Sequence, residues 1–413
     1  MGSVTRARRI LFLTPYFFPE TGAAPVRVTA TADALAAQGW DVRVCTGMPN
    51  YPEGVVQAPY RRAIVRRERR SSGVQVLRVR TVSGGGQGLR RYLNFGSSAV
   101  VCALPAFGRW RPDVVVAEVP PPTQFLSAWF VARRFRATLV SSVADLWPET
   151  AVRLGLLAES SVVVRLAQRL EALIYRHSDR IVGVTQGIAD HVVEVRGRSP
   201  RHVAAIRNGI DTDLFFPGPP DPSVVGAVHT GSAPYLLYAG SLGVATDPAV
   251  LVRLADELAH DNIDVLVVGA GTESDLVVSA GVSHPNLQFR PSVPQHVVAE
   301  LYRGSLAGLV TLADNPFFAG TVPAKLFPIL GSGVPVLFAG DGEGADLVRT
   351  TMSGEVVAPG DAAALAAKAR AIRDDPRHRA RLGAAGRALA VDQLSWAGVA
   401  RRWTEFLNDE PAG

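Results

Sequence analysis

The first candidate for chemistry is a lysine at a predicted helix start, in a chain that uses lysine rarely. The chain has 43 basic residues, and only two of them, Lys325 and Lys368, are lysines. Lys325 lies in "GTVPAKLFPILGSGVPVL", in what the pattern predicts to be the first turn of a helix. A cation there opposes the helix dipole unless an anion binds beside it. The pattern therefore favours an anion-binding lysine over a solvent-facing one, with Pro323 near the helix start and Pro328 removing an N–H from the helix interior.

Two turns between a strand and a helix have the composition of phosphate-binding loops. "YAGSLGVATDPAV" follows an apolar strand and opens a helix, and Gly240 and Gly243 would let backbone N–H groups approach a phosphate. "PETGAAP" does the same near the start of the chain, with Gly22 as the residue of close approach. Several such turns in one chain suggest a nucleotide diphosphate ligand.

Asp145 is the carboxylate best placed for chemistry. It closes a predicted strand in "SSVADLWPETAVRLG", and catalytic side chains collect at the carboxyl ends of such strands. Capping of the following helix is the structural alternative. Metal and serine-hydrolase chemistry are not supported, because the histidines are scattered and no HExxH, CxxC or G-x-S-x-G occurs. "VVGAGTES" lacks the third glycine of a nicotinamide fingerprint.

The elements that must position these residues alternate between strands and helices, which predicts parallel sheets covered on both faces. One series runs from "RILFLTPYF" to "RIVGVTQG" and a second from "YLLYAG" to "GEVVAP", separated by a Pro- and Gly-rich stretch. We therefore predict two doubly wound, Rossmann-like α/β domains, with the ligand in a cleft between them. The expected boundaries are 1–208 for the acceptor side, 209–393 for the donor side, and 394–413 for an amphipathic C-terminal helix that packs back across the domains.

The composition indicates the class of protein, its cellular compartment and its possible partners. With 47% hydrophobic and 19% charged residues, the chain is typical of a globular protein. Cys45 and Cys102 are too few for a disulfide framework, which favours a cytoplasmic protein. The basic run Tyr60–Arg70 could be a solvated face or could meet an anionic membrane together with the apolar segment Tyr92–Phe107. Nucleic acid is disfavoured as a partner, because no aromatic residues interleave with the charges.

Taken together and in order, these segments resemble family 4 of the retaining, nucleotide-sugar-dependent glycosyltransferases, which have the GT-B fold. The resemblance covers nearly the whole chain and rests on "LTPYFFPETGAAPVR", "TGMPNYPEG", "DLWPE", "EALIYRHSDRIVGVTQGI", "RNGIDTDLF", "VPAKLFPILGSGVPVL" and "GEVVAPGD". The "PNYP" and "DLWPE" segments resemble the branch that assembles bacterial O-antigens, colanic acid and related surface polysaccharides.

This resemblance implies transfer of a sugar, of N-acetyl-hexosamine type, from a UDP-sugar or similar donor to a hydroxyl acceptor. The acceptor would be a polyprenyl-linked saccharide, at the inner face of the cell membrane, and neither a metal nor another cofactor is implied. Asp145 would contact the substrate as the catalytic-site residue. The residues expected to bind the donor are Gly22, Gly240, Ser241, Gly243, Gly320, Thr321, Lys325 and Glu343. Those expected on the acceptor side are Glu20, Arg27 and Asn50.

The chain departs from the family pattern in two places. No cation follows the phosphate turn in "SLGVATDPA", and Gly320 and Pro328 stand where relatives carry two glutamates. Lys325 is then the one obvious cation for the diphosphate on the donor side, and Glu343 is a substitute partner for the ribose. Three alternatives stay open: a glycosyltransferase of small-molecule natural products, a nucleotide-sugar epimerase, and an inactive nucleotide-sugar-binding protein.

Overall fold

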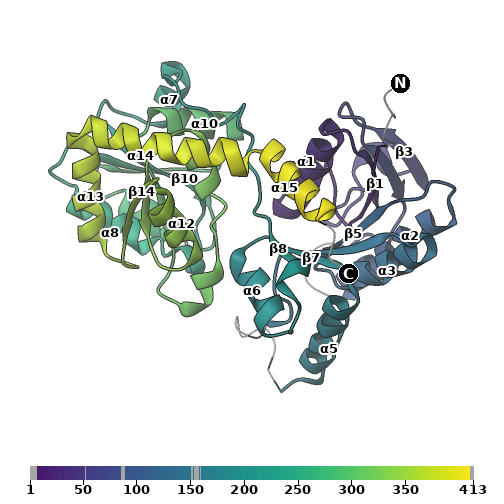
Figure 1. Ribbon diagram of the computed structural model, residues 1–413. Coiled ribbons are helices and arrows are strands. Elements are labelled where there is room, and N and C mark those ends of the chain that lie inside the picture. Colours follow the sequence, from purple (N-terminus) through teal and green to yellow (C-terminus); the bar gives the residue numbers. More distant parts are fainter. Residues whose placement is uncertain are drawn as a thin grey trace, which may run out of the picture. The chain divides into compact units, whose positions relative to one another are not determined.

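The computed structural model describes residues 7–409, except 52, 85–88, 150–151, 153–157 and 159. The chain divides into two compact units, which we call unit 1 (Met1–Asn208 with Val399–Gly413) and unit 2 (Gly209–Gly398). Each unit has its own β-sheet flanked by helices, and both sheets are parallel except at the edge strand β3 (Val65–Arg69) of unit 1 (Figure 1). The structure thus confirms the predicted fold class of two Rossmann-like α/β domains followed by a C-terminal helix.

Unit 1 is built on an eight-stranded sheet in the order β3-β4-β2-β1-β5-β6-β7-β8. All six residues of the central strand β5 are buried, as expected for a strand covered on both faces. The strands are β1 (Arg9–Leu13), β2 (Asp41–Gly47), β3 (Val65–Arg69), β4 (Gln75–Val79), β5 (Val114–Val119), β6 (Thr138–Val143), β7 (Arg180–Gly183) and β8 (Val203–Ala205). The helices are α1 (Ala23–Ala37), α2 (Leu89–Cys102), α3 (Thr123–Phe135), α5 (Val162–His177) and α6 (Gln186–Glu194), with 3₁₀ turns η1 (Ala58–Tyr60), η2 (Leu104–Phe107) and η3 (Pro200–His202).

The edge strand β3 was not predicted from the sequence. It lies within the basic run Tyr60–Arg70 and pairs antiparallel with β4, whereas the other strands of this sheet pair parallel. Consecutive charged residues hide the period-two signal of a strand, because both faces of β3 are polar. Charged edge strands are common in native sheets, since they discourage pairing with a second chain.

Unit 2 is built on a six-stranded parallel sheet in the order β11-β10-β9-β12-β13-β14. Alternate residues of β9 pack into two different apolar clusters. Leu236 and Tyr238 belong to one cluster, and Tyr235 and Leu237 belong to the other. The strands are β9 (Tyr235–Ser241), β10 (Asp264–Ala270), β11 (Leu287–Arg290), β12 (Ala307–Thr311), β13 (Val336–Ala339) and β14 (Gly354–Val357). The helices are α7 (Pro222–Val228), α8 (Ala249–Glu257), α9 (Ser274–Ala280), α10 (Gln295–Gly304), α11 (Leu326–Gly331), α12 (Glu343–Thr351), α13 (Ala362–Asp374) and α14 (Pro376–Leu389), with short turns η4 (Val244–Thr246), η5 (Pro316–Gly320) and η6 (Ala390–Leu394).

The C-terminal helix α15 (Trp396–Asn408) packs its second half on unit 1. The Trp403 ring is buried and meets Phe12 of β1 edge-on, with 6.3 Å between ring centroids. Thr404 hydrogen-bonds Gln38 and Trp40 at the end of α1, so the two helices lie side by side there (Figure 1). The Trp403 ring therefore serves to pack this helix on the sheet of unit 1.

Candidate functional site

The ammonium group of Lys325 lies against the face of an aromatic ring. Its Nζ atom is 3.7 Å from the centroid of the Tyr238 ring and donates a hydrogen bond to the Tyr238 hydroxyl. That hydroxyl in turn donates to the carbonyl of Ser241, at 2.6 Å. Lys325 makes no ion pair with any carboxylate among the described residues. Lys325 thus has an aromatic partner and, among the residues that the structure describes, no counter-ion.

Burial without a counter-ion lowers the pKa of Lys325 to about 7. The side chain is partly buried, and no neighbouring charge opposes the desolvation. An anion that bound here would raise this pKa again, because it favours the protonated form. Lys325 is therefore poised to gain a proton when a phosphate arrives near pH 7.

Gly240 and Lys325, which the sequence assigned to one donor site, are neighbours. A Cβ atom on Gly240 would lie 3.0 Å from Lys325 Cε, and the residue has a φ of +154° that disfavours side chains. The Gly243 N–H already donates to Thr246 Oγ1 at 3.1 Å, so that turn is held by its own threonine. Ser241 is exposed at the end of β9. Within the predicted phosphate-binding turn, Gly240 is thus the residue that lies next to Lys325.

Pro328 disturbs its helix less than the sequence suggested. Helix α11 has six residues, and Lys325 occupies its N-cap position rather than its first turn. Pro328 is the third helical residue, and the first four N–H groups of any helix lack partners within it. Proline here therefore costs no hydrogen bond, and Pro323 lies outside the helix, where its carbonyl accepts from the Leu326 N–H.

The remaining donor-side residues lie where η5 meets the start of α12. A Cβ atom on Gly342, which precedes Glu343, would lie 2.1 Å from the Ala319 carbonyl oxygen, so only glycine permits this approach. The next glycine, Gly344, packs on Pro323, where a Cβ atom would lie 3.0 Å from the proline Cδ. Gly320 has open space around it, and the Thr321 N–H donates to Phe318. Glu343 is thus brought to the segment that leads into Lys325.

Gly22 begins α1 in unit 1, as predicted, and no side chain caps this end of the helix. Its φ of +120° is a conformation that residues with a Cβ rarely adopt. A Cβ atom would also lie 3.2 Å from the Tyr51 ring. The first two residues of this 15-residue helix, Ala23 and Ala24, are exposed, and their N–H groups have no side-chain cap, which suits an anion-binding helix end.

The carboxylate of Glu20 links its own loop to the loop of Asn50 by hydrogen bonds. One carboxylate oxygen accepts the Phe17 N–H, and the other accepts the N–H groups of Asn50 and Tyr51, each at 2.9 Å. Burial raises the pKa of Glu20, although these donors oppose the shift. The side chain is 4% exposed, so its carboxylate oxygens accept hydrogen bonds from backbone N–H groups rather than from water. Glu20 therefore positions the loop of Gly22, while the amide of Asn50 is buried and donates to Met48.

Arg27 forms a buried ion pair at the carboxyl end of β5. Its Nη2 atom lies 2.6 Å from Glu118 Oε2, and the two side chains are 13% and 6% exposed. Its Nε atom is buried and has no hydrogen-bond partner among the described residues. One polar group of Arg27 is thus left unsatisfied by the described part of the chain.

Asp145 lies two residues beyond β6, as predicted, and is exposed. Pro148, rather than Asp145, supplies the carbonyl that accepts from the Val152 N–H, so Asp145 is not at the N-cap position. It lines a small crevice with Glu171 and Tyr175 of α5. Burial raises the pKa of Tyr175, and the nearby charges of Glu171 and Asp145 raise it further.

Sequence reasoning missed several partners of these residues. Tyr238 precedes Gly240 by two positions on β9, so strand periodicity could have placed both on one face. Glu171 accepts a hydrogen bond from Tyr175 and pairs with Arg196 at 2.5 Å, and the ring of His191 lies between Glu171 and Glu149. Nothing in the sequence spacing would have joined these to Asp145.

Comparisons with known proteins identify the class of both domains. Residues 22–209 match a "Glycosyl transferase 4-like domain", and residues 249–405 match a "Glycosyl transferase-like" domain. A glycogen synthase of Mycobacterium tuberculosis is 27% identical over 305 residues, which cover 70% of this chain and 67% of that enzyme. A D-inositol 3-phosphate glycosyltransferase of Thermomonospora curvata is 28% identical over 299 residues, which cover 67% of each chain.

A solved structure shares the whole fold. The Anabaena protein Alr3699/HepE, solved in complex with UDP, superposes with a TM-score of 0.68 at 13% identity and covers 98% of this chain and all of its own. At that identity the likeness concerns the fold alone. Two glycosyltransferase domain models match in order along the chain, and residues 22–209 match the 4-like one, so the chain is a glycosyltransferase with the GT-B fold.

Proposed function

We propose that the protein is a retaining glycosyltransferase that moves a sugar, of N-acetyl-hexosamine type, from a UDP-sugar to a hydroxyl acceptor in surface polysaccharide assembly. The observation that carries the proposal is the ammonium of Lys325, buried without a counter-ion beside Gly240. An anion with two phosphates would supply the missing charge. The UDP complex of the Anabaena neighbour supports this choice of donor.

In this proposal Lys325 contacts the donor diphosphate, and the uncapped start of α1 at Gly22 is a donor-binding element of unit 1. Their cation, N–H groups and helix dipole would stabilise the charge that develops as the diphosphate leaves. The leaving phosphate would assist attack from the same face, so that no protein nucleophile is required. Glu343 would hold the ribose, and Asp145 would contact the substrate hydroxyl.

A panel of nucleotide sugars tests the donor. We expect slow release of free UDP from one UDP-sugar, measured without acceptor, and a rise in that rate when the acceptor is added. The acceptor panel should hold a polyprenyl-linked saccharide, an α-glucan and inositol 3-phosphate, because the relatives are named for glycogen and inositol-phosphate glycosylation. Binding without any release would favour an inactive binding protein, and product from the glucan or the inositol phosphate would correct the acceptor.

Asp145 provides a prediction about turnover. Asp145→Asn should keep donor affinity within about twofold and lower kcat by roughly 10²-fold or more, because the side chain keeps its shape and loses its charge. The measurement is a UDP-release assay beside calorimetric donor binding. Asp190→Asn, an exposed carboxylate on α6, serves as the control. Normal turnover with a lower melting temperature would assign Asp145 a structural role instead.

The two segments that the sequence suggested for a membrane meet in one groove of unit 1. This groove, of about 950 Å³, is lined by Val65, Arg67 and Arg69 of β3 and by Leu104 and Phe107 of η2. The Phe107 side chain is 80% exposed. We propose that this surface meets an anionic membrane, because cations beside exposed apolar groups suit the interface of a bilayer. Among the described residues, no helix is long and apolar enough to cross one.

Vesicle binding tests this surface. Vesicles that contain phosphatidylglycerol should bind the protein, and binding should weaken as salt rises, because the attraction is screened. Arg67→Gln with Arg69→Gln should remove roughly 2 kcal/mol of that binding, about 1 per charge. Arg62→Gln is the matched control, since Arg62 is exposed in the same basic run and does not line the groove. Equal binding to neutral phosphatidylcholine vesicles would contradict the proposal.

A further inference from the structure

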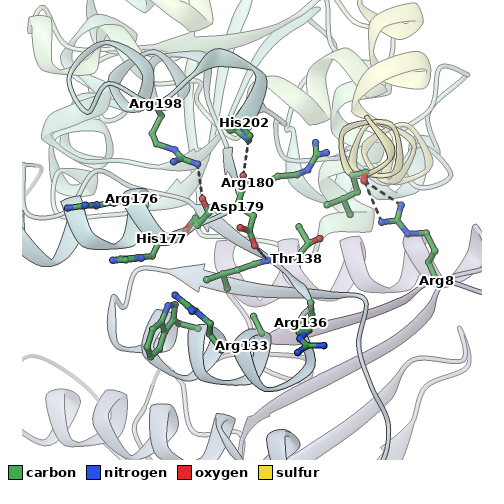
Figure 2. Close-up of a pocket in the computed structure, with 16 residues that line it drawn as sticks. Arg8, Arg133, Arg136, Thr138, Arg176, His177, Asp179, Arg180, Arg198 and His202 are labelled. Atoms are coloured by element: carbon green, nitrogen blue, oxygen red, sulfur yellow. Dashed lines mark hydrogen bonds between the residues drawn. The ribbon is translucent and has the colours of Figure 1, made fainter. Parts of the chain in front are cut away.

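We propose that unit 1 carries a second anion site, distinct from the donor-binding residues, for a ligand with two or more phosphate groups. The site is a pocket of about 980 Å³ at the amino ends of β6 and β7 (Figure 2). Every lining residue belongs to unit 1. Its basic side chains are Arg8, Arg133, Arg136, Arg176, Arg180, Arg198, His177 and His202.

The charges in this pocket are not balanced. Six arginines line it together with one carboxylate, Asp179, and that carboxylate accepts the Leu139 N–H at 2.8 Å. Burial lowers the pKa of Arg180; the charge of Asp409 opposes this shift and the neighbouring charge of Arg8 adds to it. Cations collected in a concave surface attract a multivalent anion, since each one raises the local potential.

Part of the arginine set already has a structural role. Arg8 donates to the carbonyl of Leu407 (Figure 2). Arg180 donates to the carbonyls of Phe406 and Asp409, so both arginines hold the end of α15. Arg198 donates to the Ser178 carbonyl at 2.7 Å. The Nε atom of Arg198 is nevertheless buried and has no hydrogen-bond partner among the described residues. The Nε–H group of Arg198 is thus a buried donor of the pocket that no described residue satisfies.

Three more arginines are free of ion pairs within the described part of the chain: Arg133, Arg136 and Arg176, all exposed. Arg136 ends α3 with a φ of 54°, a conformation that glycine or asparagine adopts at lower cost. The Arg133 guanidinium lies 5.2 Å from the Trp129 ring centroid, which restrains it at the pocket wall. Guanidinium groups bind phosphate oxygens in pairs, so a ligand with several phosphates matches this set.

The pocket lies at the other end of the strands from the proposed catalytic residue. Strand β6 begins at Thr138, which lines the pocket, and ends at Val143, two residues before Asp145. Five residue steps of about 3.3 Å put the two ends roughly 17 Å apart. A ligand here would thus bind without occupying the carboxyl end of the sheet.

Calorimetric titration with inorganic tripolyphosphate tests the site. We expect two classes of binding site. Arg133→Gln, Arg136→Gln and Arg176→Gln, combined in one variant, should weaken the second class at least about tenfold, because three charge-assisted contacts are lost. UDP binding should not change in that variant, whereas Lys325→Met should weaken UDP and keep the second class. The proposed donor site and this site can therefore fail independently.

Arg134→Gln is the matched control. Arg134 is the next residue of α3 and is exposed, but its guanidinium lies over the Phe135 ring and does not line the pocket. An equal loss in this control, or full tripolyphosphate binding by the triple variant, would overturn the proposal. So would a single class of tripolyphosphate site that Lys325→Met abolishes.

Vesicles separate the two sources of such an anion. If the phosphates belong to a lipid headgroup, vesicles that contain cardiolipin, a lipid with two phosphates, should bind through the three arginines even in the Arg67→Gln, Arg69→Gln background, and tripolyphosphate should compete. If the ligand is free in solution, the triple substitution should weaken tripolyphosphate binding and leave vesicle binding unchanged. Both results support a phosphate site, and they assign it to different ligands.

Discussion

Replacing Lys325 with methionine is expected to weaken UDP-sugar binding by about 1.5–3 kcal/mol, or roughly 10- to 150-fold. Methionine has a similar length and removes the charge that the donor diphosphate would meet. Calorimetric titration of the parent and the variant gives the two affinities. Lys368→Met is the control, because Lys368 is the other lysine and forms a surface ion pair with Glu355 at 2.7 Å. Equal affinity in Lys325→Met and the parent would mean that the donor site is misplaced.

The affinity of the parent should also depend on pH in a defined direction. The free protein has a Lys325 pKa of about 7, and a bound diphosphate raises it. Binding should thus be tightest below pH 7 and should weaken as the pH rises above 7, with uptake of a proton. A UDP-sugar is the ligand of choice, since its diphosphate has no ionisation near neutral pH. In Lys325→Met this pH dependence should disappear.

The same substitution should raise the stability of the empty protein near pH 7. Folding lowers the pKa of Lys325 from 10.5 to about 7, so the unfolded state binds more protons between these values. The charged lysine therefore costs the folded state free energy, most of all below pH 7. The gain in Lys325→Met should shrink as the pH approaches 10.5, which denaturant unfolding at several pH values can measure. A variant less stable than the parent at pH 7 would contradict this account.

Replacing Gly22 with valine is expected to abolish measurable donor binding while the fold survives. The new Cβ would lie 3.2 Å from the Tyr51 ring and would cover the uncapped N–H groups at the start of α1. The φ of +120° adds backbone strain of about 1–3 kcal/mol. Calorimetry with a UDP-sugar, together with circular dichroism, separates loss of binding from loss of structure.

Gly39→Val is the matched control for strain. Gly39 follows the other end of α1, has a φ of +91° and has no atom within 4 Å of a new Cβ. Both variants should lose stability because valine disfavours positive φ, and only Gly22→Val should lose the donor. If both keep normal affinity, the loop of Gly22 does not bind the diphosphate.

Local chemistry explains why much of this protein could be predicted. Short β-branched apolar runs, bounded by Gly, Pro or Asp, predicted the strands of both sheets except β3 and β8, and helical periodicity predicted most helices between them. The rarity of lysine singled out Lys325, and the glycines of "YAGSLG" singled out the end of β9. These signals are local, because they depend on the conformations and burial of neighbouring residues.

Contacts between distant segments were decided by the tertiary structure. Pairing of β9 with β12 brings the two parts of unit 2 together, so that Lys325 meets Tyr238 and Gly240 although more than 80 positions separate them. The same holds for Glu20, whose carboxylate could be assigned to the backbone of Asn50 only once the two loops were in place. The sequence by itself determined which residues could bind an anion. Which of them lie together, and which are already used by the fold, depends on packing over long sequence separations, which no local pattern encodes.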